Sequence, residues 1–169
     1  MVRIGIIGPE STGKSTLCRQ LSELYGYRWE KEYAREYMEN LDRPYTLSDL
    51  NNICRHIIKQ ISKVYKDDVV LFDTELLIMK VWYMHVYRVV PDQVLDAMKA
   101  YPMDYYLILT PDITAEPDPV RENLDKREYF LEWYIQEVMQ TQRPYRLISG
   151  QGDLRTHAAY EAINEFIKQ

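Results

Sequence analysis

Gly8-Pro9-Glu10-Ser11-Thr12-Gly13-Lys14-Ser15 is a stretch that follows an apolar run and precedes a segment with helical spacing. It fits the pattern G-x-x-x-x-G-K-[ST], in which the glycines let the backbone wrap around a phosphate while successive N–H groups point inward. The run before it, 2–7, has the composition of a short buried strand, and Leu17, Leu21 and Leu24 share one helical face after it. This order of strand, loop and helix predicts a phosphate-binding loop (P-loop).

Each fixed position of the motif has a physical task. We expect Lys14 to reach the β- and γ-phosphates of a nucleotide and the hydroxyl group of Ser15 to contact Mg²⁺, so ATP and Mg²⁺ are the expected cofactors. The residues predicted to hold the nucleotide are Gly8, Glu10, Ser11, Thr12, Gly13, Lys14, Ser15 and Thr16. The alternative is an ordinary glycine turn whose lysine is only solvated.

The composition limits the class of partner. The 169 residues include 26 Asp and Glu against 21 Lys and Arg, for a net charge of −5. Because binders of nucleic acid or anionic membranes need the opposite excess, we expect neither partner. The length predicts one domain, 1–169. No membrane-length apolar run or leader peptide is evident, and the two cysteines form no Cys-x-x-Cys motif, so a cytoplasmic location is expected.

The rest of the chain alternates between strand-like and helix-like segments. Further strands are predicted at about 27–32, 69–73, 105–110 and 145–149, with helices between them and a last helix after residue 153. This alternation predicts a three-layer α/β domain with a five-stranded parallel sheet. A helix from about 46 to 66 bears an apolar stripe that ends at Val64, and we interpret that stripe as core. We also interpret the aromatic stripe of 76–87, which includes Trp82 and His85, as mainly core.

Two carboxylates follow predicted strands. Asp73 ends the apolar run 69–73 in the form of a Walker B strand, so it is predicted to hold Mg²⁺ beside the P-loop. The alternative is that Asp73 or Thr74 caps the next helix, and both roles are compatible. Glu32 and Arg35 follow the second strand, where ligands bind in parallel sheets, and they could reach a substrate hydroxyl or phosphate. Their alternative is a solvated first helical turn.

The segment 111–127 contains three prolines, which stop regular structure, and Arg121 and Arg127 flank a turn rich in Asn and Asp. Long irregular loops are usually functional or disordered. Beside a P-loop, a basic lid that closes over the phosphates is the physical interpretation. The alternative is a surface loop whose arginines pair with nearby glutamates.

These motifs together resemble the P-loop nucleoside and nucleotide kinases, and more narrowly the ribosylnicotinamide kinase domain of NadR proteins and its AAA relatives. The matching segments span nearly the whole chain: 8–16, 32–36, 72–75, 118–121 and 143–145. The resemblance implies a P-loop NTPase fold with strand order 2-3-1-4-5. NadR proteins also carry an adenylyltransferase domain that has no counterpart in these residues, so the resemblance implies only the kinase step.

The resemblance also implies a substrate site. The residues implied to bind a nucleoside-like small molecule are Trp29, Glu32, Tyr33, Arg35, Asp73 and Glu75. The family often has Trp where this chain has Lys31 and an aromatic residue where it has Ala115. Such residues would suit a flat, cationic nicotinamide ring. Trp29, on the same strand face as Lys31, could substitute for the missing aromatic group.

The expected reaction is in-line transfer of the γ-phosphoryl group of Mg-ATP to a hydroxyl group of the acceptor, best matched by nicotinamide riboside. The expected catalytic residues are Lys14, Glu32, Asp73, Arg121 and Arg127. Glu32 or Asp73 would accept the proton, and the sequence does not choose between them. The alternative function is a P-loop ATPase or nucleotide-gated regulatory module without a small-molecule acceptor.

Overall fold

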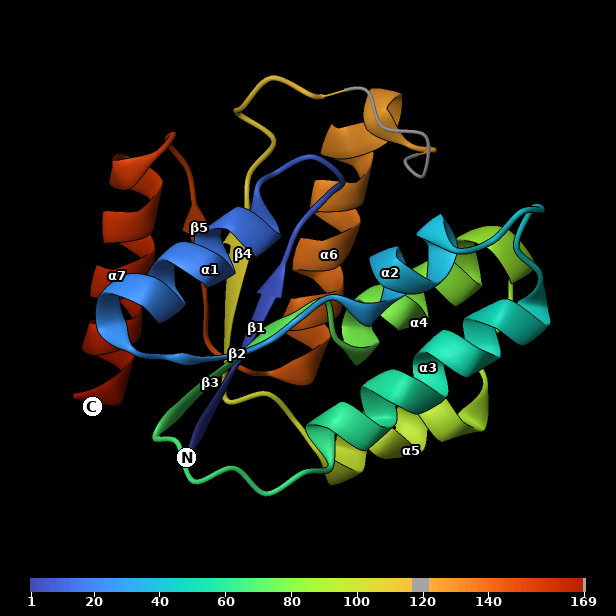
Figure 1. Ribbon diagram of the computed structural model, residues 1–169, viewed down its shortest axis with the longest axis horizontal. Coiled ribbons are helices and arrows are strands. Elements are labelled where there is room, and N and C mark those ends of the chain that lie inside the picture. The colour runs from blue at the N-terminus through green and yellow to red at the C-terminus, as the bar shows by residue number, and fades with distance from the viewer. Residues whose placement is uncertain (117–121, 169) are drawn as a thin grey trace.

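A five-stranded parallel sheet forms the centre of the protein (Figure 1). The computed structural model describes residues 1–116 and 122–168. The strands are β1 (Val2–Ile7), β2 (Arg28–Glu30), β3 (Val69–Asp73), β4 (Tyr105–Leu109) and β5 (Tyr145–Ile148). Their order is β2-β3-β1-β4-β5, and every neighbouring pair is parallel. The expected strand order 2-3-1-4-5 is thereby confirmed.

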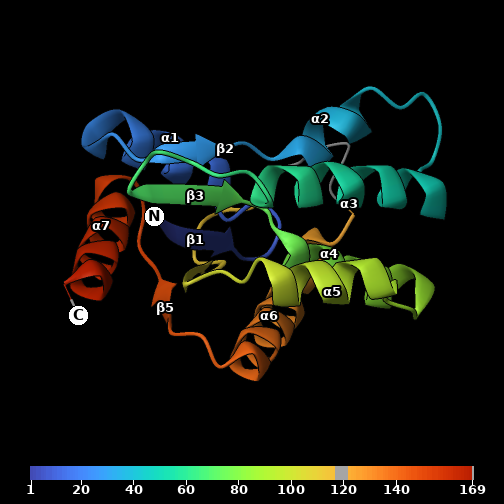
Figure 2. The same cartoon turned by 90° about the horizontal axis from the view of Figure 1, so that it is seen from below.

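Helices cover both faces of the sheet and complete the three predicted layers (Figures 1 and 2). They are α1 (Lys14–Tyr25), α2 (Tyr33–Glu39), α3 (Leu47–Ile61), α4 (Leu76–Tyr87), α5 (Asp92–Ala100), α6 (Arg127–Thr141) and α7 (Asp153–Ile167), with a short 3-10 helix, η1 (Leu124–Lys126), before α6. One core lies between the sheet and α1 with α7, and a larger core lies on the other side with α2 to α6.

The central strands have the sequence that burial on two faces requires. All five residues of β3 and all five of β4 are buried. Successive side chains of a strand point to opposite faces, so Leu71 enters the core under α1 and α7 while Phe72 enters the other core. Continuous apolar runs are therefore the expected pattern, and both strands were predicted from it. None of the helices in the described part of the chain is long and apolar enough to cross a membrane.

The predicted ends of a helix and a strand are wrong by a few residues, and some side chains on predicted apolar faces are exposed. The helix α3 ends at Ile61 rather than near residue 66, and Val64 is 93% exposed instead of core. A helix that continued to residue 66 would leave two residues to cross to β3, and a residue spans at most about 3.6 Å. Leu24 is exposed, unlike Leu17 and Leu21. The second strand has three residues where six were predicted, because β2 is an edge strand that pairs only with β3.

The carboxyl ends of the strands meet at one edge of the sheet. The P-loop follows β1, Glu32 follows β2, Asp73 ends β3, and the segment 110–116 follows β4. In the ribbon view, that segment arches over the P-loop toward the start of α6 (Figure 1). Parallel topology therefore brings the predicted functional segments together.

Candidate active site

The P-loop, residues 8–15, has the backbone conformation that its glycines permit. Gly8 has φ 145° and Gly13 has φ 79°, both in the range that favours glycine. A Cβ atom on Gly8 would lie 2.6 Å from the carbonyl oxygen of Leu109, so no other residue fits there. Ser11 also has a positive φ, 57°. Left-handed residues within a loop let successive N–H groups form a concave surface that binds anions.

Side chains of the P-loop hold part of its own backbone. The ammonium group of Lys14 donates to the carbonyl oxygens of Gly8 and Pro9, both at 3.0 Å. The hydroxyl group of Thr12, which is fully buried, donates to the Pro9 oxygen at 2.9 Å. Lys14 therefore lies folded back onto the loop in this structure. It would have to leave these oxygens to reach a phosphate group.

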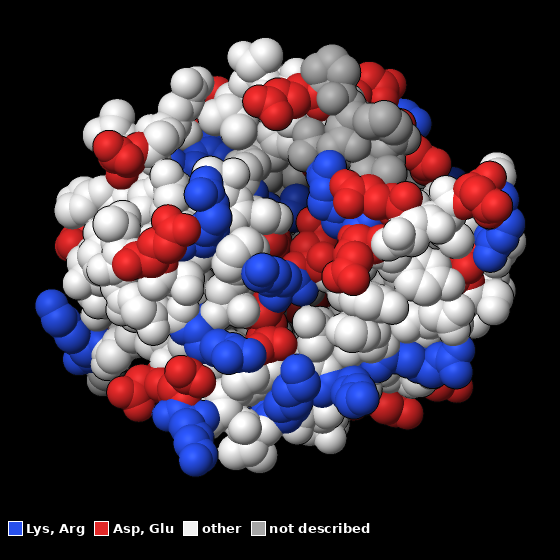
Figure 3. Space-filling model, viewed as in Figure 1, with Lys and Arg blue, Asp and Glu red and all other residues white. Residues whose placement is uncertain are grey.

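A pocket of about 470 Å³ opens in front of the P-loop. All eight residues predicted to hold the nucleotide line it, and so do Glu32 and Arg35. Figure 3 shows this face of the molecule, where acidic and basic side chains gather around a central hollow. The other lining residues are Ala34, Met38, Tyr45, Thr74, Ile78, Val81, Trp82, His85, Glu116, Glu122, Asn123, Phe130 and Tyr134. The pocket therefore combines a polar wall with an aromatic one.

Asp73 is completely buried at the end of β3, and neither of its carboxylate oxygens accepts a hydrogen bond. Burial and the nearby charge of Glu32 raise the pKa of Asp73 to about 6, although the Ser15 hydroxyl group, the charge of Lys14 and the Trp29 indole oppose that shift. The residue after it, Thr74, has φ 72°, which is a strained conformation for a β-branched side chain. Strain of this kind often marks functional sites.

These features fit a Mg²⁺ site. A buried carboxylate without hydrogen bonds lies near the hydroxyl group of Ser15, and both are hard oxygen ligands. Within the described residues, no cluster of three or more His, Cys, Asp or Glu could hold a metal ion alone. Mg²⁺ rarely needs such a cluster, because it usually binds one or two protein groups together with substrate phosphates and water. Asp73 does not cap α4, so the alternative role predicted for it is wrong.

The cap of α4 is instead Glu75. Its carboxylate accepts a hydrogen bond from the backbone N–H of Leu77 at 2.9 Å. The side chain is buried and does not line the pocket, and burial raises its pKa to about 7. The resemblance implied that Glu75 binds substrate, but in the structure it caps α4 and is not among the residues that line the pocket.

Glu32 and Arg35 both line the pocket. Glu32 precedes α2 and makes no side-chain capping bond with that helix. Arg35 forms an ion pair with Glu39 at 2.8 Å while it lines the pocket. Arg35 therefore makes the carboxylate pair of the predicted alternative, and its contact with a substrate stays a prediction. The Glu32 carboxylate faces the pocket from the end of β2.

Two other predicted substrate residues do not line the pocket. Tyr33 stacks on His56 of α3, with ring centroids 3.5 Å apart. Trp29 packs at the core beneath α1 and α7, and its ring carries the ammonium group of Lys31 at 5.4 Å from the centroid. The structure therefore does not place Trp29 as an aromatic platform for a ligand.

The aromatic wall comes from residues that the sequence did not identify. Trp82 and His85 of α4 line the pocket, although their stripe was interpreted as core. Tyr45, from the loop before α3, joins them, and its hydroxyl oxygen accepts a hydrogen bond from the Trp82 indole at 3.1 Å. Phe130 and Tyr134 of α6 complete the wall. Amphipathic spacing reveals that one helical face is apolar, but it does not distinguish a core from a pocket.

The two described ends of the predicted lid, 111–116 and 122–127, contact the P-loop. The backbone N–H of Asn123 donates to the Glu10 carboxylate at 2.9 Å, and the N–H of Glu116 donates to the Ser11 hydroxyl oxygen at 3.0 Å. Arg127, the first residue of α6, donates to the carbonyl oxygens of Ser11 and Ile113 and does not line the pocket. Arg121 lies outside the described residues.

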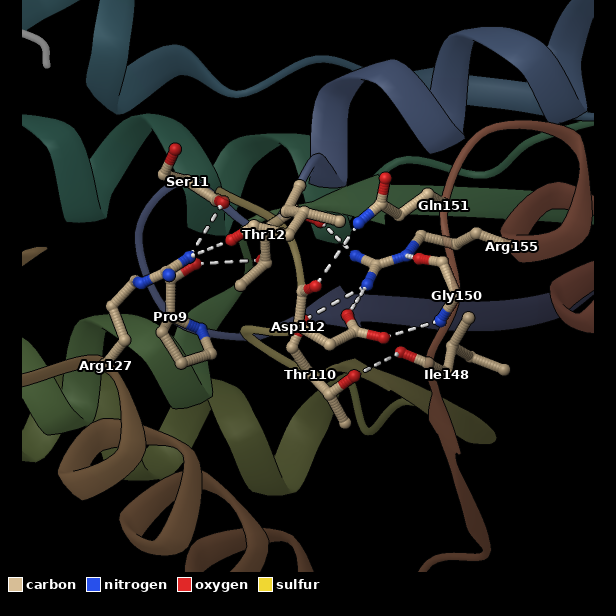
Figure 4. Close-up of polar contacts among 11 residues, drawn as sticks. Pro9, Ser11, Thr12, Thr110, Asp112, Arg127, Ile148, Gly150, Gln151 and Arg155 are labelled. Atoms are coloured by element: carbon tan, nitrogen blue, oxygen red, sulfur yellow. Dashed lines mark hydrogen bonds and ion pairs between the residues drawn. The ribbon is translucent and has the colours of Figure 1, made fainter. Parts of the chain in front are cut away.

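A residue that no sequence signal suggested also contacts the P-loop. Arg155, in the first turn of α7, is buried and donates to the carbonyl oxygen of Thr12. The same guanidinium group pairs with Asp112 at the base of the lid (Figure 4). A single Arg early in an amphipathic helix is normally solvated, so its sequence carries no hint of this contact.

The parallel sheet of order 2-3-1-4-5, with a P-loop after its central strand, defines a P-loop NTPase fold of the nucleoside kinase type. The family model described as "AAA domain" matches residues 3–156, and the chain belongs to that family. No curated protein sequence matches the chain.

Solved structures with the same fold include three named proteins. A NadR protein in complex with NR has a TM-score of 0.79 and 21% identity, over 98% of this chain and 50% of its own. Deoxyadenosine kinase from M. mycoides has a TM-score of 0.67 and 16% identity, over 97% and 100%. The YorR protein from Bacillus subtilis, in complex with phosphorylated GDP, has 0.61 and 16%, over 99% and 96%. The chain spans about half the length of the NadR protein, and these identities show the fold alone.

Proposed function

We propose that this chain transfers the γ-phosphoryl group of Mg-ATP to a hydroxyl group of a small nucleoside-like acceptor. The observation that carries the proposal is one pocket lined by all of the P-loop except Pro9, together with a carboxylate and an aromatic wall. A P-loop ATPase that acts only as a switch needs no such wall, because water is its acceptor. The pocket therefore favours a small-molecule acceptor over the regulatory alternative.

In the proposed reaction, the P-loop N–H groups hold the phosphates while Lys14 offsets the charge that develops on them. Ser15 and Asp73 would hold Mg²⁺, which when bound neutralises charge between the phosphate oxygens. Lys14 leaves the oxygens of Gly8 and Pro9 when a phosphate offers it a stronger, charged partner. Arg121 stays a predicted charge-stabilising residue.

Glu32 is the proposed general base. A base must come within hydrogen-bond reach of the proton it removes, so it must face the bound acceptor. Glu32 lines the pocket, whereas Asp73 is completely buried and does not line it. This difference in access supports the division of tasks, with Glu32 accepting the proton and Asp73 holding the metal.

Nicotinamide riboside is the proposed acceptor. Its ring is flat and positively charged, and a cation is attracted to the face of Trp or Tyr. The pocket offers Trp82 and Tyr45, and its described lining has four carboxylate side chains (Glu10, Glu32, Glu116 and Glu122) against the basic side chains of Lys14 and Arg35. The charges of Glu10 and Glu32 also raise the pKa of the Tyr134 hydroxyl group, after burial as the main cause. The likeness to NadR supports the same choice.

A panel of nucleosides, incubated with Mg-ATP and read by mass for the gain of one phosphate, tests the proposal. We expect nicotinamide riboside to have the highest kcat/KM. We also expect Glu32→Gln to lower kcat about 100-fold or more, the usual contribution of a general base. Glu36→Gln, which changes an exposed carboxylate on the adjoining helix α2, is the control. A purine or pyrimidine nucleoside with a far higher kcat/KM would reject nicotinamide riboside, and no modified nucleoside at all would reject the transfer.

A further inference from the structure

Within the part of the chain that the structure describes, four carbonyl groups of the P-loop accept hydrogen bonds from side chains, and they fall into two sets. The carbonyls of Gly8 and Pro9 are held by residues of the loop itself. Those of Ser11 and Thr12 are held by two arginines from distant helices, Arg127 of α6 and Arg155 of α7 (Figure 4). The sequence separations are 116 and 143 residues, so only the folded chain provides these contacts.

Arg155 makes the more extensive contact. Its side chain is 4% exposed, and it donates to the carbonyl oxygens of Thr12, of Gly150 at 2.6 Å and of Thr110 at 3.2 Å. It also pairs with Asp112, whose other oxygen accepts a hydrogen bond from the Gly150 N–H at 2.6 Å. All three nitrogens of the guanidinium group are engaged, so its position is fixed relative to β4, the P-loop and the turn before α7.

The direction of a carbonyl group determines the direction of the next N–H. A trans peptide group is planar, and its C=O and N–H point in opposite directions. An arginine that holds the carbonyl of Thr12 therefore also aims the N–H of Gly13 the other way. The N–H groups in this part of a P-loop are the ones that bind phosphate.

We propose that Arg155 is a positioning residue that orients the Gly13 N–H toward the nucleotide phosphates, and that Arg127 orients the Thr12 N–H through the carbonyl of Ser11. The proposal rests on the proposed binding of nucleotide phosphates to this loop. Neither arginine lines the pocket, so neither must move when phosphates bind. Lys14 differs in this respect, because it has to leave its two carbonyl oxygens.

The burial of Arg155 supports a positioning role over one in stability alone. Burying the charged Arg155 side chain costs desolvation, which offsets much of the stability that its pair with the more exposed Asp112 can contribute. A planar guanidinium group, by contrast, fixes several acceptors in one geometry. The position of Arg155 behind the phosphate-binding loop makes that geometry useful for binding.

The substitution Arg155→Lys tests the proposal, because lysine keeps the charge but cannot donate to the same oxygens in a planar fork. The probe is Mg-ADP, titrated by calorimetry well below the melting temperature. We expect its Kd to rise about tenfold, the cost of one lost hydrogen bond to a charged group. The KM for Mg-ATP should rise by a similar factor while kcat changes by less than about threefold, because the contact is equal in the ground and transition states.

The matched control is Arg146→Lys on β5, where an exposed guanidinium group pairs with Glu165 away from the P-loop. Its Kd for Mg-ADP should equal that of the parent protein. An Arg155→Lys variant that is folded and binds Mg-ADP as tightly as the parent would overturn the proposal. If that variant does not fold, Arg127→Lys decides, with the same expected rise and the same contrary result. A parent protein that binds no Mg-ADP would instead overturn the proposed function, and this inference with it.

Discussion

Asp73 shows how one side chain can reveal the chemistry of its surroundings. Its carboxylate is completely buried without a hydrogen bond, and burial with the charge of Glu32 raises its pKa. A buried carboxylate in this state costs free energy unless a positive group compensates it. A divalent cation beside Ser15 would supply that compensation. The arrangement therefore supports the proposed metal-binding role of Asp73.

Asp73→Asn should reduce the affinity for Mg²⁺, because an amide has the shape of the carboxylate without the charge that holds a hard cation. We expect the Mg²⁺ concentration for half-maximal activity to rise about tenfold or more. The free energy of unfolding without metal should not fall, since the substitution removes a buried charge that its neighbours compensate only in part. Activity against Mg²⁺ and urea unfolding provide the two readouts. An unchanged Mg²⁺ titration would contradict the metal role.

At the residue scale, the sequence predicts those positions where chemistry restricts the residue type. Lys14 and Ser15 were predicted because phosphate and metal binding restrict the motif, and Asp73 because a carboxylate at the end of an apolar strand is unusual. Arg155 could not be predicted, because its role depends on where α7 returns to the sheet. Trp82 and Tyr45 were missed for a related reason, since no local pattern distinguishes pocket-facing from core-facing aromatic residues.

At the scale of elements, hydrophobic periodicity predicted which segments form strands and helices, and tertiary geometry set their ends. The connection between α2 and α3 is an example, because its conformation depends on one carboxylate. Asp49 accepts hydrogen bonds from Arg43, Thr46 and Tyr37, and with Thr46 it forms a capping box. The loop it holds carries Tyr45 to the pocket. The Arg43 hydrogen bond, with those of Thr46, holds the pKa of Asp49 far below its ordinary value.

Asp49→Asn should therefore destabilise the protein in a pH-dependent way. A carboxylate whose pKa is lower in the folded state stabilises it above the ordinary pKa of 3.8, and this stabilisation is lost as the pH falls below that value. The difference in free energy of unfolding between parent and variant should be largest near pH 7 and should shrink below pH 4. Urea unfolding at pH 7, 4 and 3 measures it. Asp96→Asn, which removes an exposed carboxylate, is the control, and a difference independent of pH would contradict the expectation.

Of the two arginines of the predicted lid, Arg121 is the one still expected to act on the transferred phosphoryl group. Arg127 donates to backbone carbonyls, whereas Arg121 remains a sequence-based prediction outside the described residues. Charge-stabilising arginines in phosphoryl transfer contribute about 10³–10⁵ in kcat. We expect Arg121→Ala to lower kcat at least about tenfold, since several groups share this charge. Its melting temperature should stay near that of the parent. A normal kcat with a lowered melting temperature would make Arg121 a structural residue.

At the scale of the whole molecule, the alternation of strands and helices predicted the layers correctly, and the resemblance to P-loop kinases predicted the strand order. Right-handed crossovers and a P-loop after β1 leave few arrangements for five parallel strands. The aromatic wall could not be predicted in this way, because Tyr45, Trp82 and Phe130 meet only when α4, α6 and the loop before α3 are packed together. Predicting the proposed acceptor site therefore requires the tertiary structure, whereas the P-loop can be predicted from local sequence alone.

The most direct test of phosphoryl transfer is the ratio of ADP formed to acceptor phosphorylated, measured with Mg-ATP and nicotinamide riboside. A kinase should give a ratio near one, with little ADP when the acceptor is omitted, and Lys14→Ala should form neither product. ADP formation at the same rate with and without the acceptor, or without phosphorylated product, would contradict the kinase and favour an ATPase that acts as a regulatory module.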